Sequence, residues 1–251
     1  MSVPASLASS PILSFTEAAT SVSQLHQAHA YMLKTGLFHQ TFAASRLVTA
    51  ATTISYHSLS YAESIFAHVH RPNSYMYNTM IRAYATSETP ILAFTIFHKL
   101  VCEDSEVYAD KYTFTFILKA CARVCRGKEG KQIHGIVLKN GLGDDEYINN
   151  TLIHMYAKCG CFKVARNLLD RMCKDDVVSW NALLSVYAEM GLVELARKLF
   201  DEMPLRNVES WNFMVSGAYA KAGAFGEVLV LFEDMQSLKR CLAVAVVTRW
   251  R

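Results

Sequence analysis

The 251-residue sequence has no long apolar run: no window approaches 18 consecutive apolar residues, so we predict no membrane span. Charged residues are also scarce, at 19% against 52% hydrophobic residues, which is too little charge for a disordered chain. The net charge of +3 permits an anionic partner without requiring one. Neither a GxxxxGK[ST] phosphate loop nor a GxSxG nucleophile turn occurs. The sequence therefore predicts neither a P-loop nucleotide-binding enzyme nor a hydrolase with a serine nucleophile on such a turn.

The seven cysteines form neither a CxxC pair nor a plausible set of zinc ligands. Their number is odd and their spacing irregular, so we interpret them as reduced thiols in a non-secreted protein. The most tempting ligand trio is Cys121, Cys125 and His134. Cys121 and Cys125 lie one helical turn apart among apolar neighbours, however, where a small buried residue is the commoner meaning. The sequence therefore predicts no metal site and no cofactor.

An internal repeat is the strongest pattern present. The strings VVSWNALLSVYAEMG, from Val177, and VESWNFMVSGAYAKAG, from Val208, place two tryptophans 31 residues apart. Looser copies of the same pattern lie upstream, so the chain is an array of units of about 31 to 37 residues. The 31-residue spacing relates Asn150, Asn181 and Asn212, Tyr156 and Tyr187, Gly160 and Gly191, Ala165 and Ala196, and Met172 and Met203.

Residues 177–207 show what one unit folds into. From Trp180, apolar residues recur at i, i+3, i+4 and i+7, which predicts an amphipathic helix that Gly191 ends. A second apolar stripe follows, and Pro204 prevents its continuation. One hairpin cannot bury its apolar face alone, so we predict an all-α fold, an α-solenoid of about six to seven stacked helical hairpins. The small residues expected to allow close helix approach are Ala62, Ala93, Ala165 and Ala196.

Two repeat families use such hairpins. Tetratricopeptide repeats, which bind peptides, carry a W-x2-L-G-x2-Y pattern that is absent here. The strings WNALL, WNFMV, YNTMI, AKCG and FDEMP instead resemble pentatricopeptide repeats of the plant type that alternates long, short and standard units. The order LVCEDSEVYADKYTFTFILKAC, GKQIHGIVLKNGL and INNTLIHMYAKCG resembles that family too. The resemblance covers about residues 22–236 and implies binding of single-stranded RNA.

The resemblance also implies that the fifth and the last residue of each repeat together read one base. Carried over by position, the pairs are Ser45 with Asn73, Asn78 with Asp110, Thr115 with Asp145, Asn150 with Asp176, and Asn181 with Asn207, while Asn212 is a further reader with no identifiable partner. The family's rules give a target track, 5′ to 3′, of A, U, any base, U and C, then a pyrimidine. The second residue of each repeat would flank a base, and these residues are Phe42, Tyr75, Tyr112, Tyr147 and Val178, a series that Glu209 breaks.

The same polar residues have a structural interpretation, because Asn or Asp just before an apolar helical run is a common N-cap. Four Asn residues at equivalent positions favour base reading over capping. A basic segment, residues 119–131, could contact phosphates, although a solvated helix end is the commoner meaning of such a run.

No His is followed by Glu two positions later and no PCxxC occurs, so the chain lacks the zinc-deaminase signature that many proteins of this repeat type carry. We therefore predict an RNA-binding protein of organellar RNA metabolism without catalysis of its own. It would choose a C-to-U editing site for a deaminase partner in trans, or act in transcript processing and stability. The alternatives are a protein-interaction scaffold and a non-functional fragment of a longer editing factor.

The two ends differ from the array. Residues 1–21 are rich in Ser, Ala and Thr, with one acid and no Lys or Arg, which fits an organelle transit peptide and favours a chloroplast over a mitochondrion; a frayed N-terminus fits as well. Residues 237–251 depart from the family pattern. The unit before them has one extra residue between Trp211 and Gly223, so we expect a truncated or altered end to the array.

Overall fold

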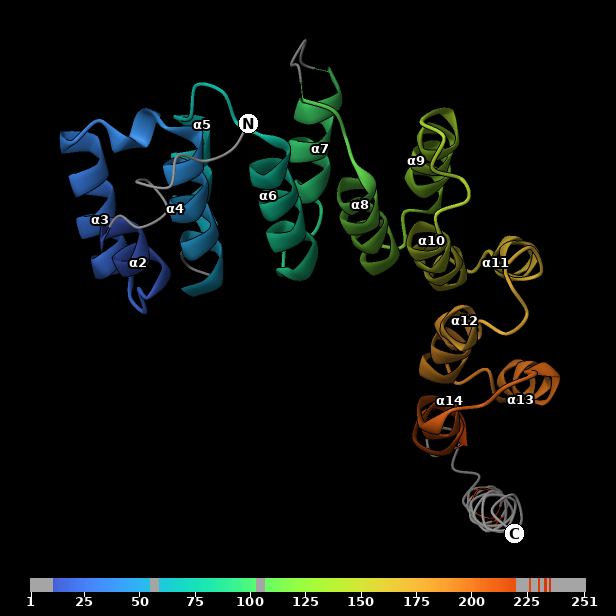
Figure 1. Ribbon diagram of the computed structural model, residues 1–251. Coiled ribbons are helices and arrows are strands. Elements are labelled where there is room, and N and C mark those ends of the chain that lie inside the picture. Colours follow the sequence, from blue (N-terminus) through green and yellow to red (C-terminus); the bar gives the residue numbers. More distant parts are fainter. Residues whose placement is uncertain are drawn as a thin grey trace, which may run out of the picture. The chain divides into compact units, whose positions relative to one another are not determined.

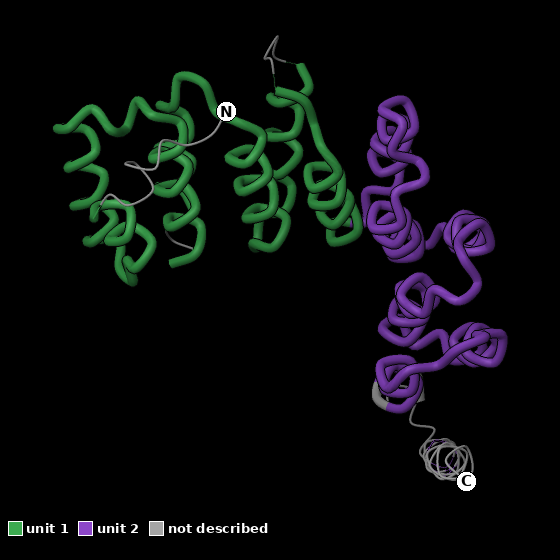
Figure 2. The backbone as a smooth tube through the Cα atoms, in the orientation of Figure 1, with its two compact units in different colours: residues 1–124 green, residues 125–251 purple. Residues whose placement is uncertain are grey.

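Residues 11–54, 59–102 and 107–219, with isolated positions further on, are described by the computed structural model. Every regular element in these ranges is a helix (Figure 1). The chain divides into two compact units, residues 1–124 and 125–251, which are shown in different colours in Figure 2. The predicted all-α class is therefore confirmed, and each unit consists of helical hairpins.

In unit 1, the first helices of successive hairpins pack side by side in one layer. Helix α4 packs on α6 and α6 on α8, while α5 covers α4 and α7 covers α6 (Figure 1). Its elements are α2 (Pro11–Glu17), α3 (Val22–Lys34), the short 3-10 helix η1 (Leu37–His39), α4 (Thr41–Ile54), α5 (Leu59–Ala67), α6 (Ser74–Thr86), α7 (Leu92–Cys102) and α8 (Lys111–Arg123).

Unit 2 repeats the arrangement. Helix α10 packs on α12 and α12 on the π-helical segment η3, with α11 against α10 and α13 against α12. Its elements are α9 (Gly127–Lys139), α10 (Glu146–Lys158), α11 (Phe162–Leu169), α12 (Val177–Glu189), α13 (Val193–Glu202), α14 (Val208–Asn212) and η3 (Phe213–Tyr219).

The apolar stripes that define the repeat form the contacts between these layers. Leu183 and Leu184 of α12 are fully buried, and Trp180 and Tyr187 nearly so. The fourth residue of a hairpin's first helix is usually aromatic and packs on the second helix of the preceding hairpin, as Trp211 of α14 does on Phe200 of α13, with ring centroids 4.8 Å apart. The alanines predicted to allow close approach are all fully buried, namely Ala62, Ala93, Ala165 and Ala196.

A glycine in the left-handed conformation ends each of several helices. Gly191 has a φ of 68°. Its N–H donates to the Ala188 carbonyl at 3.2 Å, and the next N–H, of Leu192, reaches the Tyr187 carbonyl at 2.9 Å. These bonds satisfy carbonyls at the end of α12, and only glycine adopts this φ without strain. The turn predicted at Gly191 is therefore confirmed.

Helical packing extends upstream of residue 22. Helix α2 lies inside the segment 1–21 that the sequence sets apart, and it buries Leu13 and Thr16 while packing on α3 and α4. The predicted tail, residues 237–251, lies outside the described residues.

The extra residue of the last unit coincides with a change of helix type. Helix α14 gives way at Phe213 to the π-helical segment η3, which runs to Tyr219. A π-turn accommodates one residue more than an α-turn over the same length, so the insertion is absorbed within the helix. The segment continues to pack on α12 and α13.

Candidate nucleic-acid interface

The last residue of each predicted repeat is the N-cap of the first helix that follows. Asn73, for example, accepts a hydrogen bond from the Met76 N–H at 3.0 Å, which satisfies one of the unpaired donors of the first turn. The capping interpretation is thus correct for the last residues. The fifth residues lie within the helices and cap none of them. The capping residues are Asn73, Asp110, Asp145, Asp176 and Asn207.

Asn78 and Asp110 are brought together in unit 1. The Asn78 Nδ2 donates to the Asp110 carboxylate at 3.0 Å, and its Oδ1 accepts from the Thr113 hydroxyl at 2.6 Å. The same hydroxyl accepts from the Asp110 N–H at 3.1 Å, completing a capping box. Because Asn78 is only 8% exposed, these bonds fix the orientation of its amide. Cap and predicted reader therefore form one polar network.

A groove of about 300 Å³ opens on this network. Two tyrosines predicted to flank bases, Tyr75 and Tyr112, line it and are 47% and 51% exposed. Arg82 adds a cation, and Asn78 lines the same groove. The remaining lining residues are Thr79 and Phe116. The groove thus combines two accessible rings, a fixed amide and a positive charge.

A second predicted pair meets in unit 2. The Asn181 Nδ2 donates to Asn207 Oδ1 at 3.1 Å and to Glu209 Oε2 at 3.3 Å. The Ser210 hydroxyl is turned toward Asn207, whose Oδ1 it reaches at 2.9 Å. Asn181 is only 5% exposed, and its Oδ1 has no hydrogen-bond partner. This pair is therefore in contact but incompletely satisfied.

In the third pair, the side chains of Asn150 and Asp176 are bridged by a serine hydroxyl. The Ser179 hydroxyl lies 2.5 Å from Asn150 Oδ1 and also hydrogen-bonds the Asp176 carboxylate. Asp176 accepts from the Val178 N–H at 3.0 Å as the cap of α12. The hydroxyl therefore takes the same bridging place in α12 that Thr113 takes in α8.

The remaining predicted readers are arranged differently. The Ser45 hydroxyl donates to the Phe42 carbonyl at 2.6 Å, and within the described part of unit 1 no hydrogen bond joins it to Asn73. Thr115 is fully buried and donates to the Lys111 carbonyl at 2.8 Å. Its predicted partner Asp145 belongs to unit 2, where it caps α10. Asn212 is exposed at the end of α14.

The predicted flanking residues form an exposed series at the start of the first helices. Tyr147 and Val178 of unit 2 are about as exposed as Tyr75 and Tyr112 of unit 1. Phe42 is half-buried, with the Arg46 guanidinium 5.1 Å from its ring centroid. Large exposed side chains therefore recur at the same position of successive hairpins.

Four groups in these networks were not predicted from the sequence to take part in them, namely the hydroxyls of Thr113, Ser179 and Ser210 and the carboxylate of Glu209. All three hydroxyls lie three residues after a cap, in the strings DKYT, DVVS and NVES. This is the spacing of a capping box with Ser or Thr in place of Glu, so the signal was present in the sequence.

Arg123, in the basic segment 119–131, has a structural partner. Its guanidinium donates to the carbonyls of Ala85 and Ser87, both at 2.7 Å, at the C-terminal end of α6. A cation there interacts favourably with the helix dipole. Arg123 therefore ties α8 to α6.

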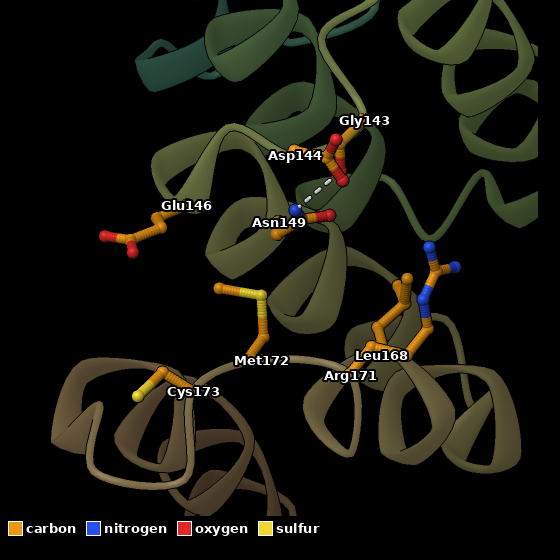
Figure 3. A pocket seen from close by; sticks show the side chains of 8 residues that line it. All are labelled: Gly143, Asp144, Glu146, Asn149, Leu168, Arg171, Met172 and Cys173. Carbon is orange, nitrogen blue, oxygen red and sulfur yellow. Dashed lines mark hydrogen bonds between the residues drawn. The ribbon is translucent and has the colours of Figure 1, made fainter.

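A smaller hollow of about 170 Å³ lies in unit 2, with Gly143 and Asn149 in its lining (Figure 3). Asn149 occupies the fourth position of α10, where Trp180 and Trp211 stand in the following first helices. Its Nδ2 donates to the Gly143 carbonyl at 2.8 Å, as Figure 3 shows. The other residues that line the hollow are Asp144, Glu146, Leu168, Arg171, Met172 and Cys173.

Two further findings concern the described ranges alone. No helix there combines the length and apolar character needed to cross a bilayer. Nor do three or more His, Cys, Asp or Glu side chains within them come together in a way that could hold a metal ion.

Stacked helical hairpins with capped, paired Asn residues define a helical-repeat protein, and comparison with known proteins identifies the kind of repeat. The PPR repeat family model matches residues 175–210, and the PPR repeat model matches residues 75–104, 150–177 and 209–239. The chain belongs to the pentatricopeptide repeat family.

Its relatives include two pentatricopeptide repeat-containing proteins of Arabidopsis thaliana. One is 54% identical over 171 residues, covering 68% of this chain and 31% of the relative. The other, chloroplastic, is 38% identical over 161 residues, covering 64% and 29%. This chain thus spans about 30% of their length.

Solved structures show the same fold. The maize pentatricopeptide repeat protein PPR10 superposes with a TM-score of 0.64 at 19% identity, over 93% of this chain and 40% of that one. PPR10 in complex with an 18-nt psaJ RNA element gives the same TM-score at 20% identity, over 84% and 32%. The α-solenoid prediction is confirmed by this match.

Proposed function

We propose that the chain is a sequence-specific, single-stranded RNA-binding protein that reads one base per repeat and has no catalysis of its own. The observation that carries the proposal is the Asn78–Asp110 pair, whose Asn78 side chain lines a groove together with the exposed rings of Tyr75 and Tyr112. An amide fixed by a carboxylate, in a groove with two accessible aromatic rings, suits an unpaired base better than it suits a peptide.

The chemistry of each part supports this assignment. A base stacked on an aromatic ring gains about 1–3 kcal/mol, whatever its identity. Identity is then read by hydrogen bonds to the base edge. Uracil presents an N–H between two carbonyls, so it needs an acceptor beside a donor, and a carboxylate next to an amide offers both. Arg82 in the same groove would neutralise a phosphate.

Relatives support the wider context. PPR10 was solved with bound RNA, and relatives of this chain in Arabidopsis thaliana are described as chloroplastic or mitochondrial. We place the protein in an organelle, with the chloroplast favoured by its Arg-free first segment. There it would select a site for C-to-U editing by a deaminase partner in trans, or act in transcript processing and stability, through the repeats of residues 22–236.

Fluorescence anisotropy at a fixed, stated salt concentration tests RNA binding. The full chain is titrated into an RNA carrying the track A, U, any base, U, C, and into a base-scrambled RNA of equal length. We expect tighter binding to the predicted track, because each matched contact discriminates by a few kcal/mol at most and several contacts add. Equal binding to both RNAs would leave only backbone contacts, and no binding to either would favour the protein-interaction scaffold.

A change of specificity tests base reading itself. By the family's rules Ser with Asn favours A, so the double variant Asn78→Ser, Asp110→Asn should move the preference at the second track position from U to A. Asn at position 110 keeps the cap of α8. Circular dichroism controls for folding, and an unchanged preference at that position in a folded variant would refute reading by this pair.

A further inference from the structure

Asn181 differs from the other paired readers in how its amide is satisfied. Its Nδ2 donates to two acceptors, Asn207 Oδ1 and Glu209 Oε2, whereas its Oδ1 has no partner. The orientation of the amide is not ambiguous. Asn207 Oδ1 is fixed as an acceptor by the Ser210 N–H at 2.9 Å, and a carboxylate such as Glu209 only accepts. Turning the Asn181 amide over would place oxygen against oxygen.

The comparison with Asn78 shows what is missing. There the hydroxyl of Thr113 donates to Asn78 Oδ1 at 2.6 Å, so the acceptor is satisfied within the protein. At the equivalent place after Asn181, the Ser210 hydroxyl donates to Asn207 Oδ1 instead. The Thr113 hydroxyl also lies 3.1 Å from Asp110 Oδ1 but reaches the reader's oxygen as well, whereas the Ser210 hydroxyl bonds to Asn207 and leaves Asn181 Oδ1 without a donor. A buried acceptor without a donor is costly, and a ligand that supplies a donor recovers that cost.

Glu209 holds this arrangement in place. It is the second residue of its repeat, where the flanking series otherwise has Tyr75, Tyr112, Tyr147 and Val178. Its carboxylate takes a hydrogen of the Asn181 amide, which leaves the buried oxygen as the only unsatisfied hydrogen-bonding group of that side chain. The Glu209 side chain is itself exposed, so it is able to readjust when a base enters between it and Val178.

We propose that Glu209 is a specificity-determining residue, which with Asn181 makes this repeat select a base that carries an exocyclic amino group, cytosine or adenine, over uracil. The inference rests on the proposed RNA-binding function. An amino group has two hydrogens, one for Asn181 Oδ1 and one for the Glu209 carboxylate. The carbonyl oxygen that uracil has in the place of the cytosine amino group would meet two acceptors and be repelled.

The test uses four RNAs that differ only in the base at the fifth track position, titrated with the full chain at one salt concentration. The wild-type protein should prefer cytosine or adenine to uracil by about three- to tenfold, the value of one hydrogen bond. Glu209→Val should lose most of this discrimination. Glu209→Gln should keep it, because its amide oxygen still accepts from Asn181 while the negative charge is removed. Glu194→Val makes the same change of charge at an exposed position of α13 and should leave the base ranking unchanged.

Each outcome separates the two levels of the inference. Removing a carboxylate reduces repulsion of the phosphates and therefore strengthens binding to every RNA alike. The ranking of the four bases, and not the affinity itself, is therefore the deciding readout. Thermal melting confirms that each variant is folded. Suppose that the wild-type protein discriminates between bases at the second track position, which Asn78 would read, but that Glu209→Val ranks the four bases at the fifth position as the wild-type protein does. The role of Glu209 is then refuted and the proposed function stands. If no position shows discrimination, the proposed function itself fails.

Discussion

At the scale of single residues, the hydrogen-bond networks around the predicted readers depend on hydroxyls that belong to the first helix of the next hairpin. Thr113 is fully buried, accepts from the Asp110 N–H and donates to Asn78. It therefore connects helix capping with the orientation of a predicted reader. Ser179 does the same for Asn150 and Asp176.

Thr113→Val should show the importance of this hydroxyl, because valine has nearly the same shape and no hydrogen-bonding group. We expect a loss of about 1–3 kcal/mol in the free energy of unfolding, since Asn78 Oδ1 loses its buried donor. Discrimination between U and A at the second track position should also weaken. Denaturant unfolding and RNA anisotropy measure the two effects. Thr113→Ser, which keeps the hydroxyl, should restore most of the discrimination, and a variant that loses stability alone would limit Thr113 to a packing role.

At the scale of elements, close approach between η3 and α12 determines where the last described repeat sits. A Cβ added at Gly217 would lie 2.7 Å from the Ala188 Cβ and 3.6 Å from its backbone. Such a contact forces one element to move, so glycine at this position has a packing reason.

Gly217→Ala should therefore destabilise unit 2 by about 1–3 kcal/mol, the usual cost of overpacking. Gly135→Ala is the matched control: it lies within α9, where an added Cβ meets nothing within 4 Å. There alanine should stabilise the helix by about 0.5–1 kcal/mol. Thermal melts of both variants compare the two effects, and equal shifts in the same direction would argue against the contact.

At the scale of the whole molecule, half-buried histidines in both units make stability depend on pH. In unit 1, burial lowers the pKa of His29, and the positive charge of nearby His26 and His68 lowers it further. In unit 2, burial and the charge of Arg171 lower the pKa of His134. Their ring nitrogens also contact the hydroxyls of Tyr61 and Tyr156, at 2.8 and 3.0 Å.

The direction of the pH effect follows from these shifts. Because the folded pKa values lie below the ordinary value of 6.5, the unfolded chain binds protons more readily. The contribution of the two histidines to the free energy of unfolding should be fully present above pH 6.5 and should fall as the pH drops below that value. We expect a lower melting temperature at pH 5.5 than at pH 7.5. Replacing both histidines with Gln, which keeps a hydrogen-bonding side chain, should reduce the difference, and an unchanged difference would assign it to other groups.

Much of this architecture follows from sequence spacing. The parts that do not follow from it have physical explanations. Periodic apolar residues and Gly191 predict the hairpins because burial and positive φ are local requirements. Position alone treats Ser45 and Asn78 as equivalent readers, yet the short Ser45 side chain bonds back to the Phe42 carbonyl while Asn78 reaches Asp110. The choice between local and long-range partners depends on side-chain length and packing, which spacing does not encode. Whether Ser45 reads a base stays a prediction.

The pairing of a reader in one hairpin with a cap and a hydroxyl in the next has a consequence for protein engineering. A hairpin cut out at its helix boundaries, such as residues 74–109, carries Asn78 but leaves Asp110 and Thr113 behind. Grafted into another array, its Asn78 would be paired with whatever cap the host supplies, so the hydrogen bonds that fix the amide would become a hybrid of donor and host. The transferable cassette therefore begins at Asn78 and ends at Thr113, with both joints inside helices.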